Sequence, residues 1–194
     1  MFGLRTEPSR VLSWHQPSTM CQARRSRGWI GGCFVALLSV LGPGCAPAAH
    51  FAGSVFRQGA VSYRVGPLSS DWQRLRSGGA NLAFRHPHGG TIVVNGQCPA
   101  QDDAPLDVLT NHLLFGVTER QEQARTTITL DGREALRTQL EGAMDGVRVA
   151  LDLVVLKKDR CLYDLQLIVG PAQRAARQPD FSAFVAGFTT AVDR

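Results

Sequence analysis

The sequence predicts an α+β domain, with a predominantly antiparallel sheet of six or seven strands and two main helices packed against it. Three observations support this prediction. Most of the chain after residue 60 alternates apolar and polar residues with the period of two that strands show. Short connections rich in Gly and Asp separate the alternating segments, which favours hairpins. Two segments break this period and place apolar residues at helical spacing instead.

The predicted strands are joined by tight turns. Asp131-Gly132 and Asp145-Gly146 can adopt the positive φ angles that two-residue hairpin turns need, and 87–90 and 157–159 are further short connections. Strands that are joined in this way run antiparallel. The alternation predicts strands at 61–65, 80–85, 91–95, 125–130, 133–140, 146–156 and 160–169.

The first predicted helix covers residues 104–116. Pro105 lies near its first position, where a missing backbone N–H costs nothing, and Gly116 lies at its exit. Asp102 and Asp103 directly precede the helix. A carboxylate at this point can cap the N-terminus and complement the helix dipole, so the acidic pair has an explanation that needs no catalysis.

The second predicted helix covers residues 179–192, with a short turn at 171–177 before it. Phe181, Phe184 and Phe188 fall on one stripe of this helix. A ligand pocket could be lined by such a stripe, but spaced aromatic side chains on a terminal helix are more often part of the core. We therefore expect these three side chains to form the docking face of the helix.

Residues 1–44 have the features of an export signal. Arg24, Arg25 and Arg27 precede a run of fourteen apolar or small residues at 28–41. Gly and Pro residues end this run before it reaches the roughly 20 residues that a membrane-spanning helix needs. Counted from Met20, the signal has an ordinary length, and we expect translation to start there.

Cys45 follows this run and is the predicted site of lipid attachment. The stretch Leu41-Gly-Pro-Gly-Cys45 resembles the lipobox of bacterial lipoproteins, although the family usually has its Leu three residues before the Cys and Leu41 lies four before. The alternative is an ordinary signal peptide that is cleaved at 46–49, with Cys45 removed or left free. A lipid on Cys45 would hold the chain at the outer or the cytoplasmic membrane, facing the periplasm or the exterior. Residues 45–58 would then be a tether, and 59–194 a single domain.

The charge of the whole chain is +5, but much of this charge belongs to the signal. Residues 1–44 hold five of the 21 basic residues and one of the 16 acidic residues, which leaves 16 and 15 in the remainder. That remainder has no polybasic stripe with interleaved aromatic residues. Binding to nucleic acid is therefore disfavoured.

Two cysteines remain after Cys45, namely Cys98 and Cys161. A pair of cysteines in an exported domain tends to form a disulfide, because the compartment is oxidising. The alternative is two unpaired thiols that pack as small apolar side chains. Given the export signal, we predict the disulfide.

Between residues 60 and 192 several motifs follow one another in a recognisable order. They are VGPL at 65–68 with Trp72, LAF at 82–84, the helix PLDVLTNHLLFG, the hairpin TLDGREA, CLYD at 161–164, and the spacing of Phe181, Phe184 and Phe188. This order resembles the PsbP-like family, which includes exported bacterial lipoproteins and the extrinsic photosystem subunit that gives the family its name. No catalytic motif is shared across that family. The resemblance implies a docking or assembly module and an unknown envelope partner or ligand.

The residues that come nearest to an active site are His86 and His88, with Asp103 further along and His112 on the first helix. Two His separated by one residue can share a metal ion, and a carboxylate can add oxygen ligands. A metal-dependent hydrolase that uses His86, His88 and Asp103 is therefore the alternative function. The spacing matches no established metal site, however, and His-Pro-His-Gly-Gly is equally typical of a hairpin tip. We therefore expect His86 and His88 to be solvated turn residues.

The chain contains no Gly-x-Ser-x-Gly elbow and no Gly-rich phosphate loop with its downstream Lys. We therefore predict a binding or assembly module that is not an enzyme and needs no cofactor. A small-ligand carrier is a third possibility, which would require an apolar cavity between the sheet and a helix.

Overall fold

The computed structural model describes residues 48–76, 79–100 and 103–190. These residues belong to one compact unit, 44–194, which has its own hydrophobic core. The predicted export signal and Cys45 lie outside the described residues. Within the described part of the chain, no helix is long and apolar enough to cross a membrane.

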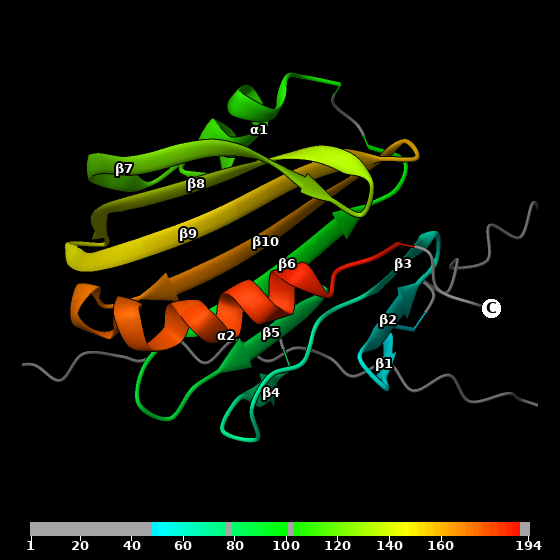
Figure 1. Cartoon of the computed structure of the whole chain (residues 1–194), viewed down its shortest axis with the longest axis horizontal. Helices are drawn as coiled ribbons and strands as arrows, with labels where there is room; N and C mark the ends of the chain where they lie inside the picture. The colour runs from blue at the N-terminus through cyan, green and yellow to red at the C-terminus, as the bar shows by residue number, and fades with distance from the viewer. Residues whose placement is uncertain (1–47, 77–78, 101–102, 191–194) are drawn as a thin grey trace, which may run out of the picture. The chain divides into compact units, whose positions relative to one another are not determined.

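An antiparallel seven-stranded sheet forms the centre of the unit, which confirms the predicted fold class (Figure 1). Its outer strands are β4 at one edge and β7 at the other. In spatial order the strands are β4 (Gln73–Leu75), β5 (Leu82–Arg85), β6 (Thr91–Gln97), β10 (Cys161–Val169), β9 (Val147–Lys158), β8 (Arg133–Met144) and β7 (Val117–Leu130).

The turns between these strands follow the predicted chemistry. Asp131 and Gly132 both have positive φ, as do Asp145 and Gly146, which is the geometry of a tight hairpin turn. Strand β7 starts eight residues before the predicted strand at 125–130. Its first half, VTERQEQA, lies at the sheet edge and is mostly exposed, so alternation could not reveal it.

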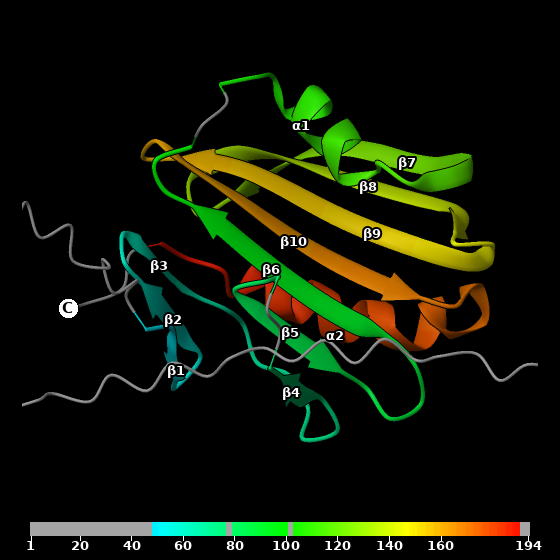
Figure 2. The same ribbon diagram turned by 180° about the vertical axis from the view of Figure 1, so that it is seen from behind.

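The sheet is covered on both faces, by one helix on each (Figures 1 and 2). Helix α1 (Leu106–Leu113) packs against β8 and β9, where its cluster includes Leu151 and Leu153. Helix α2 (Arg174–Ala186), which follows a 3-10 turn at Pro171–Gln173, packs against β10 on the other face. Phe181, Phe184 and Phe188 are all buried in the core there, which confirms the predicted docking face.

The boundaries of both helices need correction. Helix α2 starts at Arg174, so Pro179 lies inside it and not at its start, and it ends before Phe188. The N-cap position of α1 is Pro105, without a capping side-chain hydrogen bond. The predicted cap by Asp103 is therefore wrong: its side chain is fully exposed and bonds to Lys157 Nζ at 2.9 Å. Asp102 lies outside the described residues.

A second, three-stranded sheet precedes the large one. It contains β1 (His50–Ala52), β2 (Val55–Gln58) and β3 (Val61–Arg64). The predicted tether at 45–58 is therefore wrong from residue 50 onward. The alternation at 61–65 predicted β3, which lies in this small sheet and not in the large one. Strands β1 and β2 were not predicted, because they are short, but Val55 and Phe56 are buried and attach them to the core.

Backbone contact and aromatic packing attach the small sheet to the large one. Gly66 N donates to Phe184 O at 2.9 Å, and Gly187 approaches Gly66 so closely that a Cβ on either glycine would overlap with backbone atoms. An aromatic cluster adds ring contacts with centroids 5.1–6.0 Å apart. Its members are Phe56, Tyr63, Tyr163 and Phe188.

A buried carboxylate, that of Asp152 on β9, ties α2 to the sheet. Arg137 forms a two-pronged ion pair with it at 2.9 and 2.7 Å, and Gln139 and Gln178 donate to Oδ2 at 2.8 and 3.1 Å. Arg137 also donates to Ser182 on α2 at 3.1 Å. The bond to Asp152 raises the pKa of Arg137. Because every carboxylate oxygen has a donor, the charge can remain buried here.

The structure joins Cys98 to Cys161 in the disulfide that the sequence predicts. Cys98 follows β6 directly, and Cys161 is the first residue of β10, which is the neighbour of β6 in the sheet. The bridge therefore closes the end of a strand pair whose cysteines are 63 residues apart in the chain.

Removing this bridge with Cys98→Ala and Cys161→Ala should lower the free energy of unfolding by up to about 4 kcal/mol, because the unfolded chain regains the entropy of an open loop. Urea denaturation of the variant and of the oxidised protein measures the difference. Reduced wild-type protein is the matched control and should unfold with the double variant. Equal midpoints for oxidised and reduced protein would contradict a stabilising bridge.

Asp131, in the turn between β7 and β8, anchors the end of the described chain. It pairs with Lys158 at 2.7 Å, and it accepts hydrogen bonds from the hydroxyls of Thr189 and Thr190 and from the Thr190 backbone N–H at 2.8–2.9 Å. Burial alone would raise the pKa of Asp131. The hydrogen bonds from Lys158 and the two threonines outweigh this effect and lower the pKa to about 2.

Asp131→Asn should therefore lower the free energy of unfolding at neutral pH by about 1–3 kcal/mol. Because the pKa is depressed in the folded state, this contribution is present above about pH 4 and is lost as the pH falls toward 2. Denaturation of wild type and variant across that range should show the difference narrowing. Asp145→Asn, in the equivalent exposed turn with the same φ of 50°, is the control and should change little.

Candidate functional site

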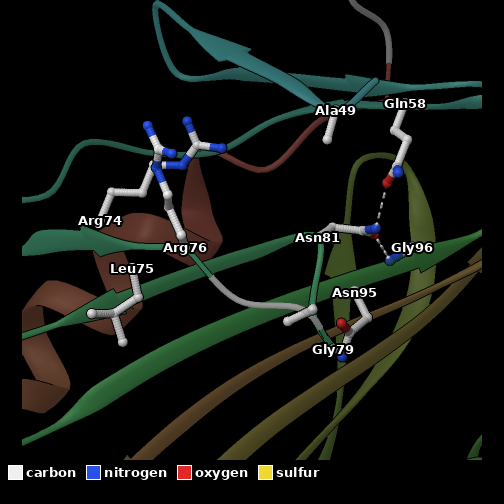
Figure 3. Close-up of a pocket in the computed structure, with 10 residues that line it drawn as sticks. Ala49, Gln58, Arg74, Leu75, Arg76, Gly79, Asn81, Asn95 and Gly96 are labelled. Atoms are coloured by element: carbon white, nitrogen blue, oxygen red, sulfur yellow. Dashed lines mark hydrogen bonds between the residues drawn. The ribbon is translucent and has the colours of Figure 1, made fainter. Parts of the chain in front are cut away.

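The main cleft, with a volume of about 860 Å³, lies where the small sheet meets the β4 edge of the large sheet (Figure 3). We call it the arginine cleft. The volume falls within the range of typical small-ligand sites. Its described lining residues are Ala49, Gln58, Arg74, Leu75, Arg76, Gly79, Ala80, Asn81, Asn95 and Gly96.

Arg74 and Arg76 supply the charge of this cleft. They occupy alternate positions at the edge strand β4 and its end, so their side chains point to the same side, whereas Leu75 between them points to the other (Figure 3). The Arg74 guanidinium lies over the Phe51 ring at 5.0 Å from its centroid. This contact holds the charge at the mouth of the cleft without neutralising it.

Asn81 connects the two sheets within the cleft. Its Oδ1 accepts a hydrogen bond from the backbone N–H of Gly96, and its Nδ2 donates to Gln58 Oε1 at 3.3 Å (Figure 3). Gln58 belongs to β2 and Gly96 to β6. The amide of Asn81 therefore sets the spacing between the two walls, and the Gln58 side-chain amide is left with N–H donors for a ligand.

A buried carboxylate lies behind one wall of the cleft. Asp164 on β10 is 8% exposed, and it accepts hydrogen bonds from Asn95 at 3.0 Å and from Gln166 at 2.7 Å. Burial raises the pKa of Asp164, and the two hydrogen bonds oppose that effect. Because Asp164 reaches the cleft only through Asn95, it holds that side chain in place and does not pair with the arginines.

Among the described residues, no carboxylate pairs with the arginines of the cleft. The Lys and Arg ion pairs found among the described residues involve Arg125, Arg137, Arg148, Lys157 and Lys158, all of them on β7, β8 and β9. Arg74 and Arg76 take part in none of them. Two guanidinium groups with unused N–H donors on one side of a cleft are suited to bind an anion, such as a phosphate or a carboxylate.

His86 and His88, from the alternative hydrolase site, lie together at the tip between β5 and β6. His86 is 4% exposed, so the expectation of solvated turn residues is wrong for it, although His88 is exposed. The His86 ring packs at 5.3 Å from Trp72, and its Nδ1 accepts a hydrogen bond from the His88 backbone N–H at 3.1 Å. These contacts account for the burial of His86 as part of the packing of the fold.

Asp103 does not join these two histidines. It lies after β6 and bonds to Lys157 near the end of β9, whereas the histidines precede β6 at its other end. The seven-residue strand between them spans about 20 Å. His112 is exposed on α1. Among the described residues, no three His, Cys, Asp or Glu side chains form a group that could hold a metal ion.

The arginine cleft was missed by the sequence analysis, because its lining comes from separate short segments. One signal was available in the sequence. Residues 48–85 contain five arginines and a single acid, Asp71, whereas 86–190 contain ten basic and thirteen acidic residues. The net charge of the chain after residue 44 is close to zero, so it does not reveal that basic residues are concentrated in one segment and acidic residues in another.

Comparison with known proteins supports the fold. No protein-family model matches the chain, and no curated protein gives a significant match. Among solved structures, cyanobacterial PsbP (CyanoP) from Synechocystis sp. PCC 6803 superposes with a TM-score of 0.50 at 12% identity, over 66% of this chain and 86% of that one. The chain therefore has a PsbP-like fold.

Two further structures are similar at 18% identity. One is LpqN, involved in cell envelope biogenesis of Mycobacterium tuberculosis, with a TM-score of 0.47 over 66% of this chain and 83% of that one. The other is PA94 from Pseudomonas aeruginosa, a protein of unknown function, with a TM-score of 0.44 over 72% of this chain and 96% of that one. Such likenesses concern the fold alone, so a function must be argued from the site.

Proposed function

We propose that this protein is a non-catalytic binding module of the cell envelope, held at a membrane by a lipid on Cys45, and that the arginine cleft binds an anionic ligand. The observation that carries the proposal is the pair of guanidinium groups, Arg74 and Arg76, which face a cleft of about 860 Å³ and have no acidic partner in the part of the chain that the structure describes. Solubility of the protein alone would not require both charges to lie on the same side of a cleft.

The lining of the cleft supports binding over catalysis. General acid-base catalysis needs a titratable side chain near the reacting atoms, and nucleophilic catalysis needs an activated hydroxyl, thiol, amine or carboxylate. The described lining residues offer guanidinium, amide, methyl and backbone groups. These groups can recognise an anion and hold it, which is the chemistry of a binding site.

The envelope location rests on the order of the segments in the chain. An export signal precedes Cys45, and the described domain starts a few residues later with β1 at His50. The disulfide between Cys98 and Cys161 fits an oxidising compartment. A diacylglycerol on the Cys45 thiol would keep the domain close to the membrane surface.

Lipid attachment can be tested with Cys45→Ser in the full chain. The variant should move from the membrane fraction to the soluble envelope fraction, because the acylated thiol is lost. Mass spectrometry of the wild-type protein should show a diacylated N-terminal Cys45. Cys33→Ser, which removes a thiol inside the signal, is the control and should stay in the membrane fraction. An unmodified wild-type N-terminus at 46–49 would contradict the anchor.

Anion binding can be tested on residues 46–194, which contain the whole core, with pyrophosphate as the probe. We expect saturable shifts in the NMR signals of the arginine side chains, and a loss of affinity of roughly tenfold or more in Arg74→Gln with Arg76→Gln. The control, Arg125→Gln with Arg148→Gln, removes the same charge from β7 and β9. If the control weakens binding as much as the cleft variant, the cleft is not the site.

A further inference from the structure

We infer that the anion in the arginine cleft is the headgroup phosphate of an anionic phospholipid, in the same membrane that holds the lipid anchor. This inference deepens the proposed function and depends on it. In this arrangement the β1–β5 end of the domain lies against the bilayer, with Arg74 and Arg76 on headgroup phosphates.

The chain between the anchored residue and the cleft is short. Ala49 lines the cleft and lies four residues after Cys45. A fully extended chain spans at most about 3.6 Å per residue, so the lining at Ala49 lies within about 14 Å of the anchored residue. Headgroup phosphates are therefore the anions that this cleft meets at the highest local concentration.

The segment next to the anchor has a net positive charge, which is complementary to an anionic membrane surface. Arg57, Arg64, Arg74, Arg76 and Arg85 lie in the segment next to the anchor, with Asp71 as its only acid. Residues 86–190, which hold the acidic excess, form the remainder of the large sheet and both helices. Anionic leaflets attract basic segments beside a membrane anchor and repel acidic ones. This separation of charge therefore favours a domain that turns its first five strands toward the bilayer.

An exposed leucine lies between the two arginines at the edge of the cleft. Strand β4 is at the edge of the sheet and is exposed along its length, and Leu75 is 40% exposed. Leu75 points to the other side of the strand from Arg74 and Arg76, so only an approach of the strand edge to the bilayer brings both sides to the surface. In that orientation the leucine methyl groups lie at the headgroup boundary while the guanidinium groups bind phosphate.

The contacts would orient the domain and are not needed to anchor it. A diacylglycerol on Cys45 carries two acyl chains and holds the chain at the membrane by itself, whereas basic residues at the surface decide which side of the domain faces the headgroups. Each basic residue near an anionic surface strengthens binding by about fivefold, so Arg74 and Arg76 together should account for roughly thirtyfold. Screening by salt should weaken this contribution.

The experiment uses residues 46–194, which lack Cys45 and its lipid, so that any membrane binding comes from the domain itself. Co-sedimentation is measured with vesicles of phosphatidylcholine alone and of phosphatidylcholine mixed with phosphatidylglycerol. We expect binding to the mixed vesicles only, reduced by added salt and reduced about thirtyfold in Arg74→Gln with Arg76→Gln. Thermal unfolding checks that the variant is folded, and Arg125→Gln with Arg148→Gln is the control of equal charge.

Each outcome decides the question. Loss of vesicle binding in the cleft variant, with binding kept in the control, supports the inference. Equal binding by both variants overturns it, because general charge would then explain the attraction. If wild type ignores the mixed vesicles but still binds pyrophosphate at the cleft, the ligand is a soluble anion, and the proposed function stands without this inference. If it binds neither probe, both proposals fall.

Discussion

The close approach of Gly66 to Gly187 is the constraint on which the site depends. At this point the backbone that follows β3 lies directly against the end of α2, and a side chain at either position would push the two apart. The aromatic rings of Tyr63 and Phe188 fill the space beside the contact. Because Gln58 comes from the small sheet and the arginines from the large one, the cleft exists only while these two sheets are held together.

The position of α2 is itself fixed by two different kinds of interaction. Three phenylalanines supply apolar area, which is non-directional and would tolerate some sliding of the helix. The buried Asp152 supplies direction, because its bond from Gln178, and the bond of its partner Arg137 to Ser182, form only at one position of the helix. Trp72 adds a hydrogen bond to Asp180 at 2.9 Å, which attaches the segment before β4 to the same helix. A chain of contacts thus runs from the buried Asp152 through α2 to the strand that carries Arg74.

Sequence patterns predicted the parts of this fold that local chemistry determines. Asp131-Gly132 and Asp145-Gly146 act within their own turns, and β9 and β10 each contain enough buried apolar residues to be recognised within their own windows of sequence. The patterns failed where contacts between residues far apart in the sequence determine the structure. Val55 and Phe56 were assigned to a tether, because their burial depends on core residues that lie far away in the chain. His86 is buried because Trp72 packs against it. The cleft combines four short segments, so no single window of sequence contains it.

The distribution of charge is not explained by the interactions that stabilise the fold. Surface arginines contribute little to stability, so the fold alone does not explain why the segment 48–85 holds five arginines and a single acid. Evenly mixed charge would serve solubility equally well. A net charge near zero that is divided between two parts of one domain would instead orient that domain at a charged membrane surface. Under our proposal, the lipid on Cys45 and the short chain before β1 keep Arg74 and Arg76 close to the headgroups.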